Sequence, residues 1–310
     1  MVKGICLLLC TAFLCGLSGC SGKASATEEG TGFYFDTVVS FQITGEESGK
    51  LLEGCFSLCR EMEKIFDRTD EESELYAVNH RESSAVELSE DLAAVVETGI
   101  QFYDLTGGKL DITVAPLSDL WDFSGGREEP PAAEEVQEAL SKVDGSSIRL
   151  EGRTLYFDRP DTELDLGALA KGYISDKLKA YLESEGVEHA LINLGGNVMT
   201  VGDAPDGSAW KVGIQKPFEE RGTVGQVVEV RDQAVISAGT YERFFWWKGK
   251  LYHHIIDPDT GYPAETEKDQ VTIICREGIL GDALSTSCLL LGSEKAEKLM
   301  ERFPEARMIV

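Results

Sequence analysis

The feature that most constrains this chain is a carboxylate inside an apolar run near the C-terminus. Residues 281–292 read GDALSTSCLLLG, in which Asp282 and three small hydroxyl side chains interrupt leucine and alanine. A charge that is buried without a partner costs several kcal/mol, or its pKa shifts until the group is neutral. Any fold of this chain must therefore expose the segment or supply a compensating partner for Asp282.

The spacing within this run suggests one kind of partner. Asp282 and Thr286 are four residues apart in a helical pattern, so their oxygens lie on one face of a helix. A carboxylate and a hydroxyl form a hard-oxygen pair that suits Mg²⁺ or Ca²⁺ and does not suit zinc. On this pair alone, the favoured alternative is a helix-start aspartate that caps backbone N–H groups, with Thr286 bonded back to its own turn.

The N-terminus has the layout of a secretory signal. Residues 1–20 read MVKGICLLLCTAFLCGLSGC: a lysine, an apolar stretch too short to span a bilayer comfortably, then small residues that end at a cysteine. The ending resembles the lipobox of bacterial lipoproteins and predicts a signal peptide over 1–19 and lipidation of Cys20. An ordinary signal cut nearby is the alternative. Lipidation predicts a protein anchored at the extracytoplasmic face of the bacterial cell membrane.

The segment after the signal is small, polar and rich in Gly and Ser, so residues 20–32 are predicted to be a flexible tether. The remainder, 33–310, is long enough for a substantial core. It mixes helical and strand patterns without a regular βαβ rhythm, which favours an α+β fold over a doubly wound sheet.

Hydrophobic periodicity assigns the individual elements. The predicted helices span 50–66, 89–105, 132–143, 281–291 and 294–302, and a further helix follows a glycine turn within 164–184. The predicted strands are 33–44, a hairpin over 147–158, a strand in ALINLGGNVMTVG interrupted by its two glycines, two or three strands within 210–256, and the segments 270–276 and 307–310.

Charge and cysteine content narrow the class of protein. The 310 residues include 55 acidic and 29 basic side chains, a net charge of −26 with no basic cluster, so no nucleic-acid partner is expected. The cysteines beyond residue 20 lack the spacing of a zinc site. They are expected to be buried free thiols, with a disulfide as the alternative: Cys55, Cys59, Cys275 and Cys288.

Two glycine-bearing stretches could approach a ligand closely. In DLGALAKGY, Asp165 precedes a glycine turn and Lys171 lies in the first helical turns. Backbone N–H groups at a helix start, with a lysine beside them, can cradle a phosphate, although the spacing of a Walker loop is absent. The second stretch, NLGGNV, contains two adjacent glycines whose backbone could also approach the ligand closely. Taken singly, each stretch is equally a simple turn.

A third stretch, LYHHIIDPDTGYPAE, contains two of the four histidines of the chain. His253 and His254 close a strand that runs into an Asp-Pro-Asp-Thr-Gly turn. A histidine at a strand end can accept a proton near neutral pH. The alternative has one histidine exposed and the other packed in the sheet, with the aspartates only shaping the turn.

In combination, these motifs resemble a known family. DxxxxxKG, NLGGN, HHIIDPxTGYP and DALST, in this order and after a lipobox, are similar to the FAD:protein FMN transferases, the ApbE-like flavin-transfer lipoproteins. The resemblance runs from about Phe33 to the C-terminus. It implies one compact catalytic unit with mixed, largely antiparallel sheets flanked by helices. The implied activity is Mg²⁺-dependent transfer of FMN from FAD to a Thr or Ser hydroxyl of an acceptor protein, with release of AMP.

The resemblance also implies roles for individual residues. Asp282, Thr286 and the backbone carbonyl of Ala168 would bind Mg²⁺, with Ser285 adjoining, so the cation would be the partner of Asp282. His254 matches the histidine proposed as the base. The positions that match the FAD site are Phe35, Lys109, Leu110, Asp111, Asp165, Lys171 and Ile256.

The acceptor implied by the resemblance is an extracytoplasmic membrane redox subunit that carries a flavinylated threonine or serine. Two other activities stay open at this point. A Mg²⁺-dependent FAD pyrophosphatase would use the same residues, with water in place of the acceptor hydroxyl. A non-catalytic lipoprotein that binds FAD or another solute belongs to a different class. The predicted tether, the acidic composition and the extracytoplasmic location fit such a protein equally well.

Overall fold

The computed structural model describes residues 26–310, so the predicted signal peptide and Cys20 lie outside the described residues. Part of the predicted tether belongs to the fold. Strand β1 (Ala26–Tyr34) pairs along its whole length with β2 (Thr37–Gly45). Small polar residues are compatible with an edge strand because the backbone supplies the pairing, which composition alone does not reveal.

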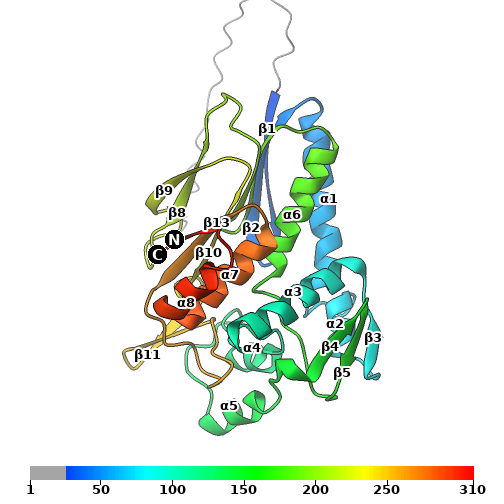
Figure 1. Cartoon of the computed structure of the whole chain (residues 1–310), viewed down its shortest axis with the longest axis vertical. Coiled ribbons are helices and arrows are strands. Elements are labelled where there is room, and N and C mark those ends of the chain that lie inside the picture. The colour runs from blue at the N-terminus through cyan, green and yellow to red at the C-terminus, as the bar shows by residue number, and fades with distance from the viewer. Residues whose placement is uncertain (1–25) are drawn as a thin grey trace, which may run out of the picture.

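An antiparallel sheet forms the centre of the fold (Figure 1). Its strand order is β1-β2-β6-β7-β10-β13-β14, and each neighbouring pair runs antiparallel. The strands that follow β2 are β6 (His189–Leu194), β7 (Asn197–Val201), β10 (Ala234–Gly239), β13 (Gln270–Cys275) and β14 (Arg307–Ile309). This topology confirms the predicted α+β class and its largely antiparallel sheets.

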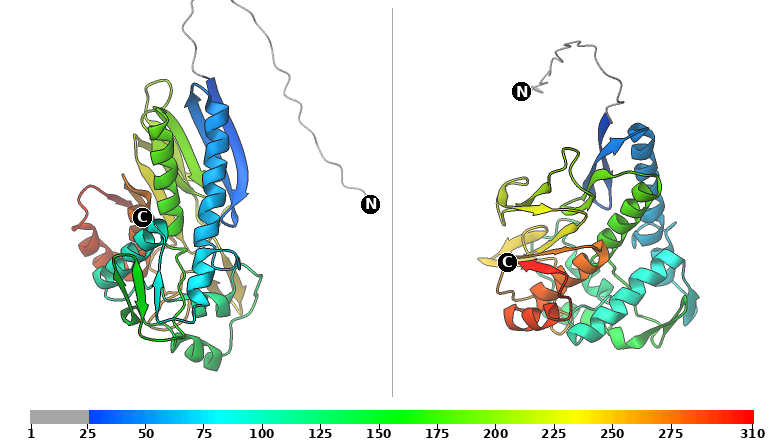
Figure 2. Two further views of the ribbon diagram at one scale, coloured as in Figure 1. Left: turned by 90° about the vertical axis from the view of Figure 1, so that its right-hand side faces the viewer. Right: turned by 45° about the horizontal axis from the view of Figure 1, so that its top comes forward.

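Helices cover one face of this sheet. The long helices α1 (Ser48–Phe66) and α6 (Ala170–Ser184) lie side by side on it, as Figure 2 shows. The buried face of α1 includes Leu51, Cys55, Cys59 and Met62, a spacing that keeps apolar side chains on one stripe of a helix. The same core includes side chains of α3 (Glu90–Thr106), α7 (Gly278–Leu291) and α8 (Ser293–Met300).

The opposite face is covered by a hairpin of β8 (Trp210–Gln215) and β9 (Val224–Val230). Its apolar side chains pack on alternate residues of the central strands, including Val198, Val235 and Ile274. Alternation along a strand places successive side chains on opposite faces, so the central strands are buried on both sides.

Smaller elements complete the molecule. The predicted hairpin over 147–158 is confirmed as β4 (Ile148–Glu151) and β5 (Thr154–Phe157), which β3 (Ala85–Glu87) extends to three strands. The segment 210–256 holds five strands rather than two or three, because β8, β9 and β10 precede the hairpin of β11 (Phe244–Trp247) and β12 (Lys250–His253). The other elements are α2 (Glu74–Asn79), α4 (Ala115–Trp121), α5 (Ala133–Leu140) and the short 3₁₀ turn Gly145–Ser147.

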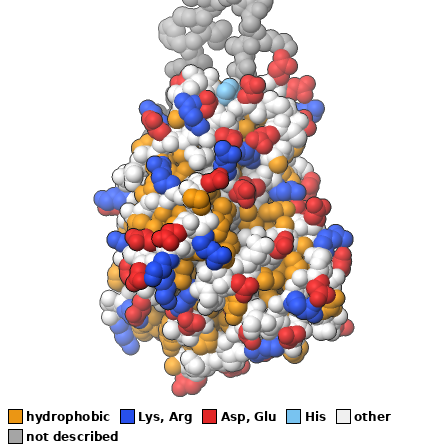
Figure 3. Space-filling model, in the orientation of Figure 1, with side chains coloured by type: hydrophobic (Ala, Val, Ile, Leu, Met, Phe, Trp, Pro, Cys, Tyr) orange, Lys and Arg blue, Asp and Glu red, His pale blue; other side chains and the backbone are white. Residues whose placement is uncertain are grey.

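The surface carries charges of both signs. On the face shown in Figure 3, Lys and Arg side chains are interspersed with Asp and Glu. The four cysteines of the described chain are buried and free, as predicted. Burial raises the pKa of each thiol to about 12, so these groups stay protonated at neutral pH.

Helices α6 and α7 approach each other at two glycines. A Cβ atom on Gly172 would lie 2.2 Å from the carbonyl oxygen of Gly278. Both oxygens of Asp176 on α6 accept backbone N–H groups at the start of α7, from Gly278 at 2.6 Å and Ile279 at 2.9 Å. These contacts fix the position of α7, the helix that carries Asp282, against the start of α6.

The close approach predicts that Gly172→Ala destabilises the protein. The added methyl group meets backbone rather than a flexible side chain, so we expect a loss of about 1–3 kcal/mol of unfolding free energy in urea denaturation. Gly49→Ala is the control, since nothing lies within 4 Å of its Cβ position, and it should leave stability unchanged or slightly raised. Equal effects of the two substitutions would contradict the tight contact.

Candidate active site

A cavity of about 1200 Å³ opens between the central sheet, the start of α6, helix α7 and the segment that follows β12. Pockets of about 300–1,000 Å³ hold most small ligands, so this cavity has room for a dinucleotide. Every predicted site residue within the described chain lines it: Phe35, Lys109, Leu110, Asp111, Asp165, Ala168, Lys171, His254, Ile256, Asp282, Ser285 and Thr286. The structure therefore brings them together, and their individual roles stay predictions.

The partners of Asp282 come from the two glycine-bearing stretches. Its Oδ2 accepts the backbone N–H of Gly172 at 2.5 Å, and its Oδ1 accepts the side-chain amide of Asn197 at 2.6 Å. Burial raises the pKa of this carboxyl group above its usual value, and the charge of Lys171 and the two hydrogen bonds offset only part of that increase. Helix α7 begins at Gly278, so Asp282 does not cap the start of its own helix.

The three hydroxyl groups that follow Asp282 differ in their surroundings. Ser285 is buried and donates to the backbone carbonyl of Asp282 at 3.1 Å, whereas Thr286 lies one turn above Asp282 and lines the cavity. The Ser287 hydroxyl is buried and finds no hydrogen-bond partner among the described residues. Of Ser285 and Thr286, which both line the cavity, only Thr286 makes no hydrogen bond back to its own helix in the described structure. Its hydroxyl is therefore the one available beside the Asp282 carboxylate.

The oxygen donors at this site fit a magnesium ion that takes some of its ligands from the protein and others from the substrate. Nowhere in 26–310 do three or more His, Cys, Asp or Glu side chains gather as a metal cluster. The residues predicted to bind the metal place the Asp282 carboxylate, the Thr286 hydroxyl and the backbone at Ala168 on the wall of the cavity. Mg²⁺ is commonly held by one or two carboxylates together with phosphate oxygens and water. The Asp282 oxygens each accept one hydrogen bond and retain further lone pairs.

The cations of the cavity are held in different ways. Lys109 Nζ lies 2.6 Å from Asp257 and 2.8 Å from Asp259, and although burial lowers its pKa, these hydrogen bonds raise it overall. Lys171 makes no ion pair with any described residue, and its charge acts on Asp282 and His254. Lys171 is thus the lysine whose charge remains available to an anionic ligand.

Asp111 and Asp165 each bond to their own loop and to a second segment of the chain. Asp111 accepts the backbone N–H of Thr113 and of Gly145, at 2.8 and 2.9 Å. Asp165 accepts the N–H of Gly167 at 2.8 Å, and its second oxygen lies 3.6 Å from Nε of Arg68. These bonds hold the loop backbone against the cavity.

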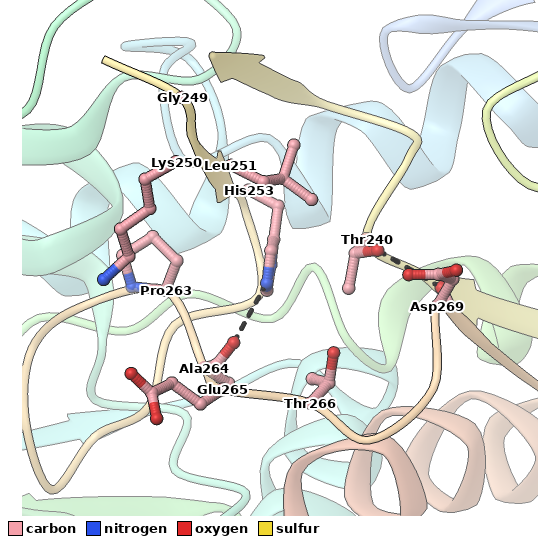
Figure 4. A pocket seen from close by; sticks show the side chains of 10 residues that line it. All are labelled: Thr240, Gly249, Lys250, Leu251, His253, Pro263, Ala264, Glu265, Thr266 and Asp269. Atoms are coloured by element: carbon pink, nitrogen blue, oxygen red, sulfur yellow. Dashed lines mark hydrogen bonds between the residues drawn. The ribbon is translucent and has the colours of Figure 1, made fainter. Parts of the chain in front are cut away.

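The structure separates the two histidines. His253 is buried, its Nε2 lies 3.1 Å from the carbonyl oxygen of Ala264, and it faces a second pocket of about 420 Å³ (Figure 4). His254 is half-buried and faces the large cavity, and its Nδ1 has no partner in the described chain. Of the pair, His254 is the one placed to act on a ligand in the large cavity.

His254 is neutral at physiological pH. Burial, together with repulsion from Arg243, His253 and Lys171, lowers the pKa of His254 to about 3. A neutral imidazole carries a lone pair that can accept a proton. Negative phosphate groups in the cavity would offset the repulsion by the cations and raise the pKa of the imidazole towards the range of a useful base.

Comparison with known proteins decides the family. A sequence model of the ApbE family matches residues 35–310. The chain belongs to the ApbE family. The matched segment contains every predicted site residue that lines the cavity, which confirms the resemblance inferred from the motifs.

Individual ApbE-family relatives agree over most of the chain. An FAD:protein FMN transferase of Treponema pallidum is 33% identical over 319 residues, which cover 96% of this chain and 88% of the relative. The FAD:protein FMN transferase of Escherichia coli K12 is 30% identical over 258 residues, 77% of this chain and 73% of the relative.

Solved structures share the fold. The flavin transferase ApbE from Vibrio cholerae superposes with a TM-score of 0.81 at 28% identity, covering 91% of this chain and 93% of its own. The ApbE protein from Thermotoga maritima superposes with a TM-score of 0.82 at 29% identity, with the same coverage of 91% and 93%.

A tight turn brings Phe35 of this ApbE-family chain to the cavity. Phe35 and Asp36 connect β1 to β2 with φ angles of 55° and 56°, which cost non-glycine residues about 1–2 kcal/mol each. The N–H of Phe35 donates to Glu63 on α1 at 2.9 Å. The predicted strand 33–44 ran through this turn because Phe-Asp lacks the glycine that usually marks a two-residue hairpin turn. Backbone strain of this kind tends to occur at functional sites.

Sequence reasoning missed several residues of the ApbE-family cavity. Arg68 lies between Asp119, at 2.5 Å, and Asp165, and no pattern in its polar surroundings distinguishes it. Asn197 was visible inside the NLGGN motif, but its contact with Asp282 was not. Arg221 and Arg243 also line the cavity and come from loops whose position depends on the hairpins β8–β9 and β11–β12.

The low pKa of His254 predicts a pH-dependent stability. In the unfolded chain the imidazole titrates near 6.5, and in the folded protein near 3, so between these values only the unfolded state takes up the proton. The wild type should therefore lose about 2 kcal/mol more than His254→Gln when the pH falls from 7.5 to 5. Urea denaturation at both pH values measures this. Parallel losses in the two proteins would contradict a buried neutral imidazole.

Proposed function

We propose that this protein transfers FMN from FAD to a Thr or Ser hydroxyl of an acceptor protein in a Mg²⁺-dependent reaction that releases AMP. The single observation that carries the proposal is the meeting of Asp282, Thr286, Lys171 and His254 on one cavity with room for a dinucleotide. Membership of the ApbE family and the names of the relatives support the same activity.

Different residues would bind the metal, compensate the phosphate charge and position the substrate. Asp282, Thr286 and the carbonyl of Ala168 would hold the magnesium ion, which when bound neutralises phosphate charge and stabilises the leaving AMP. Lys171 adds a fixed positive charge for the phosphates. The loops held by Asp111 and Asp165, together with Phe35 and Ile256, would position the flavin dinucleotide for in-line attack.

The reaction balances with one proton acceptor. The acceptor hydroxyl oxygen attacks the phosphorus on the FMN side of FAD, a new phosphoester bond forms, and the bond to the AMP oxygen breaks. AMP leaves with that electron pair. The hydroxyl proton passes to the neutral imidazole of His254, the histidine that lines the cavity.

The cellular location of the protein is proposed from the sequence. We propose that Cys20 is lipidated and anchors the protein at the extracytoplasmic face of the bacterial cell membrane. The acceptor would then be an extracytoplasmic membrane redox subunit. Among the described residues, none of the helices is long and apolar enough to cross a membrane.

Mass spectrometry of the acceptor tests the function. The protein is incubated with FAD, Mg²⁺ and a candidate membrane redox subunit, and the subunit is searched for an FMN-sized adduct on Thr or Ser. An adduct that requires Mg²⁺ supports the transferase. Free FMN and AMP without an adduct would instead identify a pyrophosphatase. Flavin binding that EDTA leaves unchanged, without turnover, would identify a binding protein.

Removal of the metal carboxylate gives a second prediction. Asp282→Ala should lower AMP release by at least about 100-fold, because the phosphate charge is no longer compensated, while the circular dichroism of the folded protein is retained. Ser287→Ala on the same helix is the matched control, since this hydroxyl is buried, does not line the cavity and has no hydrogen-bond partner in the part of the chain that the structure describes. Its activity should equal that of the wild type. Full activity of Asp282→Ala would refute the metal site.

A further inference from the structure

Asn197 occupies a special place between two motifs. It is the first residue of β7 and follows Gly195 and Gly196, whose φ angles of 67° and 109° form the hairpin turn from β6. Its backbone pairs with Leu194 across that turn, and only 4% of the residue is exposed. The side chain therefore has little freedom, and its amide points to α7, where it donates to Asp282 Oδ1 at 2.6 Å.

The two hydrogen bonds on Asp282 come from two different elements. The N–H of Gly172 binds Oδ2 from α6, and the amide of Asn197 binds Oδ1 from β7. One donor on each oxygen restricts rotation of the carboxylate about its Cβ–Cγ bond. The remaining lone pairs are then held in a constant direction. The Gly172 donor belongs to the backbone, so Asn197 is the partner that a substitution can remove.

The chemistry of the amide suits a carboxylate that must also bind a cation. A Lys or Arg at this position would form an ion pair, neutralise Asp282 and repel a divalent ion. A second carboxylate would repel Asp282 itself. An amide donates a hydrogen bond without adding net charge, so it orients the carboxylate and leaves its negative charge for the metal. Lys171 acts on Asp282 through its charge but makes no ion pair with it in the described structure.

We propose that Asn197 is a positioning residue that holds the Asp282 carboxylate in the orientation that binds the divalent cation. The proposal rests on the proposed function, because it assumes that Asp282 is a magnesium ligand. Residues that orient metal ligands typically affect metal affinity by about 10–100-fold when they are replaced. Asn197 acts through Asp282, so its loss should change the magnesium requirement more than the rate at saturating magnesium.

The test uses Asn197→Leu, which keeps a similar side-chain volume and removes the donor. Two titrations with MgCl₂ are made at fixed FAD: one follows FAD binding by the quenching of flavin fluorescence, and the other follows AMP release. We expect the half-saturating Mg²⁺ concentration to rise about 10–100-fold in both. The rate at saturating Mg²⁺ should stay within a few-fold of the wild type. A purely structural role would not raise the Mg²⁺ requirement selectively.

Thr200→Val is the matched control on the same strand. Thr200 is fully buried, donates to the carbonyl of Gln233 at 2.9 Å and accepts its N–H at 3.0 Å, so its replacement also breaks buried hydrogen bonds of β7. It has no assigned contact with Asp282 and does not line the cavity. Its thermal stability should fall, whereas its half-saturating Mg²⁺ concentration should match that of the wild type.

The outcomes separate this inference from the function on which it rests. A wild-type Mg²⁺ requirement in Asn197→Leu overturns the positioning role and leaves the transferase intact. An equal increase in Thr200→Val also overturns it, because the effect is then a general one of β7. If the wild type itself needs no Mg²⁺ for binding or AMP release, the metal site and this inference fail together. Should Asn197→Leu not fold, Asn197→Ala decides by the same titrations.

Discussion

The buried carboxylate of Asp282 is the group on which the arrangement of the site depends. Its two oxygens take hydrogen bonds from the backbone of α6 and from the side chain of Asn197 on β7, so one group joins three parts of the chain. A buried charge that loses a partner is strongly destabilising, which makes these contacts obligatory. The glycine contact between α6 and α7 and the bonds from Asp176 to the start of α7 meet that requirement by holding the two helices close.

Basic as well as acidic side chains line the cavity of this acidic protein. The chain carries a net charge of −26, yet several cations line the cavity wall. Lys109 and Arg68 are neutralised by nearby carboxylates and stiffen the loops that carry them. Lys171 is left to act at a distance on Asp282 and His254. In the proposed reaction both kinds of cation are useful. The paired ones hold the loops that would contact the dinucleotide, and the unpaired one can compensate the charge of its phosphates.

Long periodic elements were predictable from the sequence, whereas short or irregular ones were not. The apolar stripe of α1 predicted a helix over 50–66, and the helix spans Ser48–Phe66. The turn at Phe35 and Asp36 escaped prediction because its conformation is imposed by pairing of β1 with β2 and by Glu63. The short α2 and α4 depend on packing rather than on propensity, and isolated helices of that length are not stable.

The sequence by itself determined which residue types were available and in what order, and these sufficed for the α+β class, the family and the candidate residues of the site. The family resemblance had already pointed to His254, and the structure shows that His254 rather than His253 faces the cavity. Tertiary structure alone decided that Asn197 and Gly172 hold Asp282. The physical reason is the separation along the sequence between residues that interact. Periodicity reports neighbours three or four residues away, whereas these hydrogen bonds join positions 85 and 110 residues apart, and only the packing of the helices on the sheet brings them within reach.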